Sequence, residues 1–374
     1  IPIDKVILFL DLASGSLNHI KDSNLENIFI IDHHEITQEI PEKINIVNPE
    51  LHEKQKMSCS CLTYLFCKEI VSETKELAKL AILGMIGDQL EKEIDKLNHS
   101  ILEDGEIKRK RGLLMYPSTR PLNKTLEYCP KFYIPKITGN AQGVMELLRE
   151  IGLNPENKKY KSLIELDEKE MEKLVTAIML RAQKIKNTDL IGDIFLIKFF
   201  NKLEDARELS AKINACSRFG DASTAIQFCM EMPKAKKRIE AIHIRYKQLI
   251  ISGLKFASET EKINGNGFTI INSKDQIRDT MAGTIASILS NSPLYQEGTI
   301  ITILAYYGNK IKVSSRNVGK NGRNVREILE RVTKQIGGEV GGHKFAAGCI
   351  IDKEKEQDFI ELLKKNLEIE MVRI

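Results

Sequence analysis

The sequence predicts an α/β protein with two lobes, the first built on a parallel sheet, together with a helical insert and a connecting helix. Its 374 residues suffice for two or three domains of roughly 150 residues each. In the first part, continuous apolar runs at 6–10 and 28–31 alternate with helical patterns, which is typical of βαβ units. After the turn at Gly265-Asn266-Gly267 a second alternation of strand and helix patterns begins. It predicts a second, smaller α/β lobe.

The first domain is expected over residues 1–152. Helical patterns cover 58–72, 77–86 and 142–151, and the last of these ends at Gly152. A looser stretch lies between them, with the basic run at 108–111 and four prolines: Pro117, Pro121, Pro130 and Pro135.

The rest of the chain divides into three parts by pattern. Residues 153–235 are expected to form a helical insert, because helical periodicity covers 168–185 and 203–217. A long helical pattern without Pro or Gly over 234–251 predicts a connecting helix, which we place at 236–262. The last domain, 263–374, should hold strands at 268–271, 299–307 and 310–315 and helices at 279–289, 324–336 and 354–367.

The composition excludes several classes of protein. With 42% hydrophobic and 29% charged residues the chain is too apolar to be disordered, and no apolar run reaches the roughly 18 residues of a membrane span. The net charge of +4 is compatible with a polyanionic partner. Seven dispersed cysteines favour reduced thiols over a disulfide framework, so we expect a cytoplasmic protein without a membrane partner.

Acidic and imidazole side chains follow apolar runs at three places in the first lobe. Asp11 follows 6–10, the triplet Asp32-His33-His34 follows 28–31, and Asp88 follows the run at 81–86 as at a strand-like turn. Ligands of open α/β sheets bind beyond the carboxyl ends of the strands, so these groups can converge there. Taken singly, Asp11 or Asp88 would be more typical of a helix cap or a turn. Together with adjacent histidines they favour a site for Mn²⁺, Mg²⁺ or Zn²⁺.

Two features of the last lobe suit a phosphate. The run 341–348 is Gly-Gly-His-Lys-Phe-Ala-Ala-Gly, and its small residues let backbone N–H groups approach an anion. Arg316, after Ser314-Ser315, offers a planar fork for bidentate binding. Alone, the run would equally be a tight turn with a capping histidine, and Arg316 a surface ion-pair partner. Two basic runs, 108–111 and 234–238, are either solvated faces or phosphate contacts.

The triplet Asp32-His33-His34, the pair Gly87-Asp88 and the run 341–348, in this order, resemble the DHH phosphoesterase superfamily in its DHHA1 branch. Within that branch the chain resembles the RecJ-like nucleases of archaea, and the stretches near Arg120-Pro121-Leu122 and Tyr133-Ile134-Pro135 are similar too, with less specificity. The resemblance covers most of the chain. It implies a parallel-sheet DHH catalytic domain and a DHHA1 substrate-binding domain facing each other across a cleft.

The resemblance implies roles for the residues of the first lobe. Asp11 matches an aspartate that bridges two metal ions, and His33 and Asp88 match further metal ligands. His34 matches a residue close to the metals and the substrate phosphate, so the implied catalytic residues are His33, His34 and Asp88. Asp32 would hold the imidazoles in the required tautomer. The implied cofactors are two divalent ions, Mn²⁺ or Mg²⁺.

The resemblance also implies substrate contacts in the last lobe and shows one departure. Arg316, Gly341, Gly342 and His343 match groups that bind the scissile region and the nucleic-acid backbone. The family's first strand carries an Asp-x-Asp motif, and no such motif precedes Asp11. We expect that motif upstream of Ile1. A degenerate, inactive relative would also lack it, but such relatives usually lose several other ligands that this chain keeps.

The leading hypothesis is a two-metal exonuclease that removes nucleotides from single-stranded DNA or RNA in replication or repair. The low aromatic content of 6% favours binding through phosphates over base stacking. A phosphodiesterase for short oligonucleotides or cyclic dinucleotides is an alternative, which the insert disfavours. A third hypothesis is a replisome scaffold of reduced activity, because relatives bind GINS and replicative-helicase components.

Overall fold

The computed structural model describes residues 5–36, 38–52, 56–71, 73–92, 94–128, 134, 136–181, 190–292 and 294–372. The chain forms two compact units, one of Ile1–Asn214 with Ala225–Lys236 and the other of Ala215–Thr224 with Lys237–Ile374. Pro130, Tyr133 and Pro135, which the sequence analysis singled out, lie outside the described residues. Among the helices that the structure describes, none combines the length and the apolar character needed to cross a membrane.

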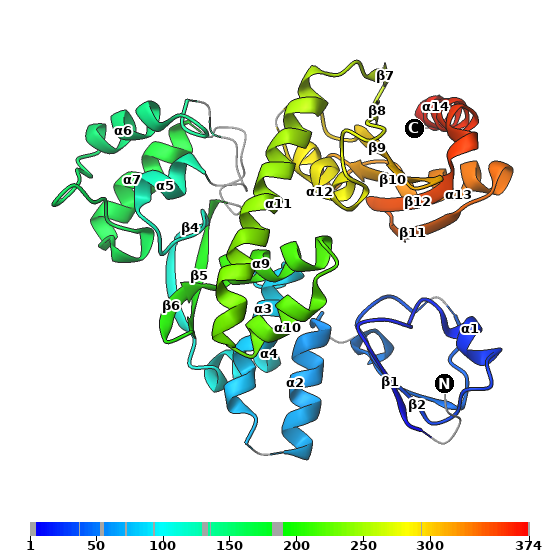
Figure 1. Cartoon of the computed structure of the whole chain (residues 1–374), viewed down its shortest axis with the longest axis horizontal. Coiled ribbons are helices and arrows are strands. Elements are labelled where there is room, and N and C mark those ends of the chain that lie inside the picture. The colour runs from blue at the N-terminus through cyan, green and yellow to red at the C-terminus, as the bar shows by residue number, and fades with distance from the viewer. Residues whose placement is uncertain are drawn as a thin grey trace. The chain divides into compact units, whose positions relative to one another are not determined.

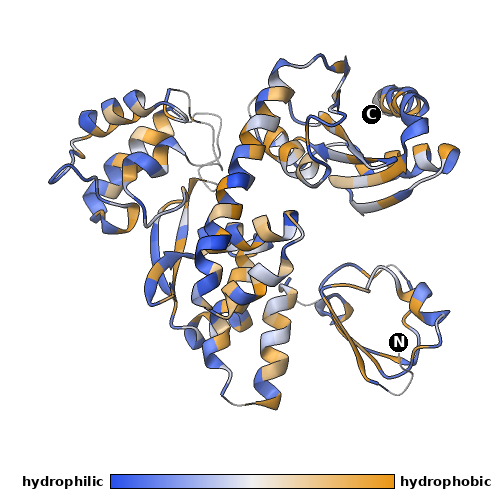
Figure 2. Cartoon of the chain, in the orientation of Figure 1, coloured by the Kyte–Doolittle hydropathy of each residue, from blue (hydrophilic) through white to orange (hydrophobic). Residues whose placement is uncertain are grey.

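The first unit begins with a small parallel sheet. The strands β1 (Ile7–Leu10), β2 (Ile28–Ile31) and β3 (Ile44–Val47) lie in the order β1-β2-β3. The helix α1 (Leu17–Lys21) connects β1 and β2, and these three elements are labelled near the N-terminus in Figure 1. The strands are rich in hydrophobic residues, which are orange in Figure 2. On one face, α1 and the strands share a buried core whose members are Leu17, Ile20, Ile28, Ile30 and Ile44. Because the strands are parallel, their carboxyl ends share one edge, as predicted.

Helices follow the sheet. They are the short η1 (Pro49–His52) and η2 (Lys75–Leu77), and then α2 (Cys59–Ile70), α3 (Ala78–Gly87) and α4 (Lys96–Asp104). The predicted helix at 77–86 is confirmed, so Asp88 is the C-cap of α3 and does not follow a strand. A short apolar run cannot be assigned to strand or helix by periodicity, and here the ten-residue length and the alanines favour the helix.

A second sheet in the first unit was not predicted. It is antiparallel, in the order β4-β5-β6, with β4 (Lys108–Leu113), β5 (Ile191–Phe199) and β6 (Lys202–Asp205). The basic run at 108–111 is therefore a strand, and the stretch 153–235 contains strands as well as helices. The helices of this region are α5 (Leu122–Glu127), α6 (Ala141–Glu150), η3 (Leu163–Glu165), α7 (Glu168–Arg181), α9 (Ala206–Arg218) and α10 (Ala222–Cys229).

The second unit is a six-stranded sheet covered on both faces. The 27-residue helix α11 (Pro233–Glu259) leads into it and packs with α12 (Asp279–Ser290) on one face, whereas α13 (Val325–Ile336) and α14 (Glu356–Val372) cover the other. The short η4 (Lys353–Lys355) precedes α14. The strand order is β11-β12-β10-β9-β8-β7. The strands are β7 (Ile263–Gly265), β8 (Phe268–Asn272), β9 (Ile300–Tyr307), β10 (Lys310–Asn317), β11 (Glu339–His343) and β12 (Ala346–Asp352).

The predicted strands and helices of this lobe are confirmed, with one difference in the glycine-rich run. The run 341–348 is mostly strand, because Gly341 pairs with Gly348 and Gly342 with Ala347 between β11 and β12. Only Lys344 and Phe345 form the turn between these two strands. The run therefore positions backbone groups along a strand pair at the edge of the sheet.

Candidate metal centre

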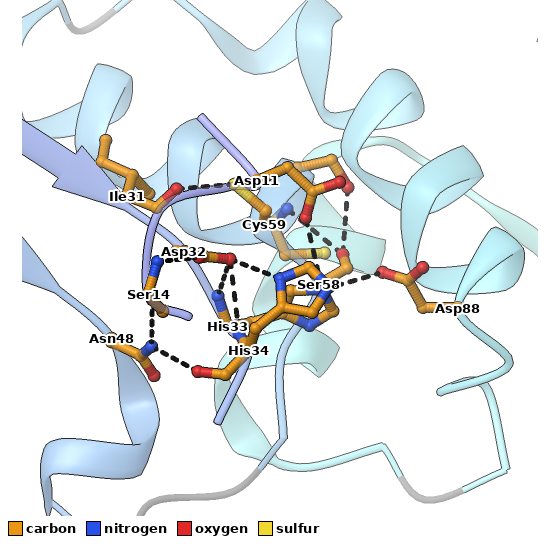
Figure 3. A network of polar contacts seen from close by, with 12 residues as sticks. Asp11, Ser14, Ile31, Asp32, His33, His34, Asn48, Ser58, Cys59 and Asp88 are labelled. Carbon is orange, nitrogen blue, oxygen red and sulfur yellow. Dashed lines mark hydrogen bonds and ion pairs between the residues drawn. The ribbon is translucent and has the colours of Figure 1, made fainter. Parts of the chain in front are cut away.

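Three side chains from the carboxyl ends of β1 and β2 form one cluster. The ligand atoms of Asp11, His33 and His34 lie within 4.8 Å of one another. Nε2 of His33 lies 3.3 Å from a carboxylate oxygen of Asp11 and 3.9 Å from one of Asp88 (Figure 3). The structure thus brings together the four residues for which the sequence analysis predicted metal or catalytic roles in this lobe. These roles stay predictions.

The backbone beyond the strands explains how the cluster forms. The N–H of Asp11 donates to the carbonyl of Ile31 at 3.0 Å, and the N–H of Asp32 donates to that of Val47 at 3.1 Å. These bonds carry the strand pairing one residue past each strand end. Asp11 then adopts a left-handed φ of 63°, a conformation that aspartate tolerates better than most residues, and the chain turns away.

Asp32 is fully buried and anchors the triplet without being part of the cluster itself. One carboxylate oxygen accepts the N–H of His33 at 2.8 Å and Nδ1–H of His34 at 2.7 Å, and the other accepts the N–H of Ser14 at 3.0 Å. Burial alone would raise the pKa of Asp32, but these hydrogen bonds outweigh it and lower the pKa to about 2. The resulting anion holds the proton of His34 on Nδ1 and leaves the Nε2 lone pair for a ligand.

The bonds of Asp32 to the two histidines differ. It bonds to the ring of His34 but only to the backbone N–H of His33. The ring of His33 instead faces Asp11, whose hydrogen bond raises the pKa of His33 against the effect of burial, and the charge of Asp88 adds to this. Burial raises the pKa of Asp88 in turn. Protonation of His33 and Asp88 therefore competes with the binding of a cation at this position.

The position of Asp88 depends on close packing between α2 and α3. A Cβ on Gly84 of α3 would lie 1.9 Å from the hydroxyl of Ser60 on α2, so only glycine fits there. The Ser60 hydroxyl donates to the carbonyl of Ala81 at 3.1 Å. Cys59, at the start of α2, donates its thiol to the carbonyl of Ile31 at the end of β2. These contacts tie the C-terminal end of α3 to the strand that carries the histidines.

The donor set fits a divalent cation. Imidazole nitrogens and carboxylate oxygens in one cluster suit Mn²⁺ or Zn²⁺, and the carboxylates suit Mg²⁺. The side chains of Asp11, His34 and Asp88 are 62%, 46% and 42% exposed, so the cluster is open to a substrate. Asp11, His33 and His34 would hold an ion, with Asp88 beside them.

The second unit holds the other predicted site residues. Arg316 on β10 donates Nε to the hydroxyl of Ser287 at 3.0 Å and lines a cavity of about 480 Å³ together with Gly341 and Gly342. Gly342 has φ 122°, and a Cβ there would lie 2.4 Å from the carbonyl of Ala346, so this strand pair requires glycine. His343 ends β11 with an exposed side chain and is not among the residues that line the cavity.

Two residues near these sites were missed by the sequence analysis. Arg218 lies close enough to Arg316 that its charge, after burial, helps to lower the pKa of Arg316. Within the part of the chain that the structure describes, the buried Nε of Arg218 has no hydrogen-bond partner. Asn48, directly after β3, is 3% exposed and bonded to the triplet. For Arg218, the available signal in the sequence was its place at the end of a helical pattern. For Asn48, it was an Asn-Pro pair directly after a short segment of alternating apolar residues.

Comparisons with known proteins identify two family domains in the chain. The model of the DHHA1 domain matches residues 266–368, and that of the DHH-CID domain matches 115–189. The protein MJ0831 of Methanocaldococcus jannaschii is 29% identical over 371 residues, which cover 95% of this chain and 79% of that protein.

Solved structures agree in fold. CDC45 from Entamoeba histolytica has a TM-score of 0.64 at 12% identity and covers 96% of this chain and 84% of its own. RecJ of Thermus thermophilus in complex with Mn²⁺ has a TM-score of 0.54 at 17% identity, over 96% of this chain and 44% of that one. The predicted resemblance is thereby confirmed: the chain carries a DHHA1 domain and a DHH-CID domain, and its fold is similar to that of RecJ.

Proposed function

We propose that this protein is a divalent-metal-dependent phosphodiesterase that removes nucleotides from single-stranded DNA or RNA. The observation that carries the proposal is the cluster of Asp11, His33 and His34, whose ligand atoms lie within 4.8 Å, with Asp88 beside it. RecJ structures of similar fold contain Mn²⁺ or Mg²⁺, which supports the class of ion. In this proposal residues 1–152 are the catalytic domain and 263–374 the substrate-binding domain.

The residues of the cluster prepare the site for hydrolysis. Asp32 fixes the tautomer of His34, and the carboxylates of Asp11 and Asp88 complete a negative surface for two cations. A bound divalent ion lowers the pKa of a water ligand and offsets charge on a phosphate.

Phosphate binding falls to the second unit. Arg218 and Arg316 are neighbouring cations, and the guanidinium of Arg218 has a buried nitrogen without a partner among the described residues. A phosphate oxygen would satisfy that nitrogen and reduce the repulsion between the two arginines. The backbone at Gly341 and Gly342 lines the cavity beside Arg316. Such contacts recognise the backbone of a strand without reading its bases.

A second candidate is a replisome scaffold with little hydrolytic activity, which binds GINS or components of the replicative helicase. The fold similarity to CDC45, with a TM-score of 0.64, supports it. The retained cluster of ligand-type side chains favours the enzyme. Deleting 153–235 would not test the scaffold cleanly, because it removes β5 and β6 and leaves β4 unpaired. A pull-down of GINS should therefore use the full chain.

The deciding experiment measures hydrolysis of labelled single strands. End-labelled DNA and RNA strands of increasing length, with a duplex and a cyclic dinucleotide as controls, are incubated with Mn²⁺, Mg²⁺ or a chelator. We expect metal-dependent shortening of long single strands. Cleavage confined to dinucleotides would support the short-oligonucleotide phosphodiesterase, and GINS binding without cleavage would support the scaffold.

Variants connect the activity to the cluster. His33→Ala and Asp88→Ala should each lower the rate by orders of magnitude, because a two-metal site loses a ligand. His19→Ala, an exposed histidine on α1, is the matched control and should retain the wild-type rate. Full turnover by a correctly folded His33→Ala protein would refute the metal assignment.

A further inference from the structure

Asn48 lies at the end of the third parallel strand, at the same edge where Asp11 follows β1 and Asp32 follows β2. Asn48 is a polar residue, yet it is almost fully buried. Its Nδ2 group donates to the Ser14 hydroxyl at 3.1 Å and to the carbonyl of His34 at 2.9 Å. Its Oδ1 accepts the N–H of Glu50 at 3.0 Å. Three of its four hydrogen-bonding positions are thus used, which defines a single side-chain orientation.

Ser14 links Asn48 to the buried carboxylate. The side chain of Ser14 accepts from Asn48, and its backbone N–H donates to Asp32 at 3.0 Å (Figure 3). Ser14 and Asp32 are both 0% exposed, so water does not compete for these bonds. One polar chain therefore joins the ends of all three strands.

His34 is held at three points by this chain of bonds. Asp32 accepts from the ring Nδ1 and, at 3.3 Å, from the backbone N–H of His34, and Asn48 donates to the His34 carbonyl oxygen. Both bonds to Asp32 lie on the N-terminal and side-chain parts of the residue, and the bond from Asn48 holds the peptide that follows it. Together the three bonds define both the place and the direction of its Nε2 atom.

We propose that Asn48 is a positioning residue for the candidate metal centre, which acts through Ser14 and the His34 carbonyl to hold Nε2 of His34 in its ligand position. The inference rests on the proposed function in one respect, since it takes His34 as a metal ligand. Asn48 itself contributes no atom to the cluster. Its removal should therefore weaken metal binding in addition to any loss of stability.

The test uses the full chain with three variants and a control. Asn48→Ala removes all three bonds. Asn48→Asp keeps the shape and the acceptor for Glu50 but loses both N–H donors. Ser14→Ala removes only the bond from Asn48, because the backbone N–H to Asp32 remains. Asn45→Ala is the control, an exposed asparagine on β3, the strand that Asn48 follows. Calorimetric titration with Mn²⁺ and thermal unfolding without metal are measured for each.

We expect Asn48→Ala and Asn48→Asp to weaken Mn²⁺ binding by about 10- to 100-fold, the range found when groups that orient metal ligands are removed. Ser14→Ala should lose less, and Asn45→Ala nothing. A lower melting temperature with unchanged Mn²⁺ affinity would show a purely structural role and overturn the proposal. If Asn48→Ala fails to fold, Asn48→Asp and Ser14→Ala decide the question by the same measurement.

Different experimental outcomes would refute the positioning role of Asn48 and the proposed function. If the wild-type chain binds Mn²⁺ but cleaves no nucleic acid, the proposed function fails and the positioning role is still judged by the titration. If the wild-type chain binds no Mn²⁺, both fail. Equal Mn²⁺ affinity in the wild type and the folded Asn48 variants removes the positioning role alone.

Discussion

Nδ1 of His34 lies 2.7 Å from the buried carboxylate of Asp32, whereas the neighbouring His33 meets the same carboxylate only through its backbone N–H. The two histidines of the triplet therefore differ in electrostatic surroundings. His34 is oriented by the Asp32 anion. His33 faces Asp11 and Asp88, whose carboxylates favour its protonated form and raise its pKa.

Asp32 should stabilise the fold in a pH-dependent way. Its pKa is about 2 in the folded chain, below the usual 3.8, so its contribution is present above pH 4 and is lost as pH falls through 2. A shift of this size corresponds to about 2 kcal/mol at neutral pH. Urea unfolding between pH 2 and 7 should show a gap between wild type and Asp32→Asn that shrinks with acid. The exposed Asp22→Asn is the control, and a gap independent of pH would contradict the assignment.

The affinity for Mn²⁺ should fall as the pH is lowered through the raised pKa of His33. The bond to Asp11 favours the protonated imidazole, and a proton must leave before the nitrogen can bind a cation. Without metal, the same shift stabilises the fold below pH 6.5, and this stabilisation is lost as pH rises through the folded pKa. Mn²⁺ titrations from pH 5.5 to 8.5 measure the effect. A proton-linked slope that His33→Ala leaves intact would assign the linkage to another group.

Gly84→Ala should destabilise the first unit and weaken metal binding. The new Cβ would meet the hydroxyl and the Cβ of Ser60, so α3 must move and carry Asp88 with it. Overpacking of this kind costs about 1–3 kcal/mol. The double variant Gly84→Ala with Ser60→Gly should recover part of the loss, because both clashing atoms are gone. Gly15→Ala, where a Cβ meets nothing within 4 Å, is the control in urea unfolding.

Arg316→Ala and Arg218→Ala should each weaken binding of a single strand and flatten its dependence on salt. One phosphate contact contributes about one unit to the slope of log K against log salt. Fluorescence anisotropy with a labelled single strand at several salt concentrations gives this slope. The exposed Lys365→Ala on α14 is the charge-matched control. Slopes equal to that of the control would place both arginines outside the path of the strand.

The sequence by itself determined the parts of the fold that depend on local pattern. Apolar runs at 6–10 and 28–31 predicted the first strands, because a buried parallel strand is apolar on both faces. Since parallel strands end at one edge, the same runs also predicted that Asp11 and the triplet would meet. Most strands and helices of the last lobe were predicted for a similar reason, from apolar runs or helical periods that end at a turn or cap, whereas β7, β11 and β12 were not predicted.

Only the tertiary structure decided the contacts between segments distant in sequence. The basic run at 108–111 is a strand because it pairs with residues of β5 that lie far along the chain, and local charge gives no sign of this. Asp88 reaches His33 because Gly84 lets α3 pack tightly on α2. Asn48 holds His34, and Arg218 approaches Arg316, through side chains that carry no metal-ligand or motif signature. Such contacts depend on burial and hydrogen bonding between elements, which exist only once the chain has folded.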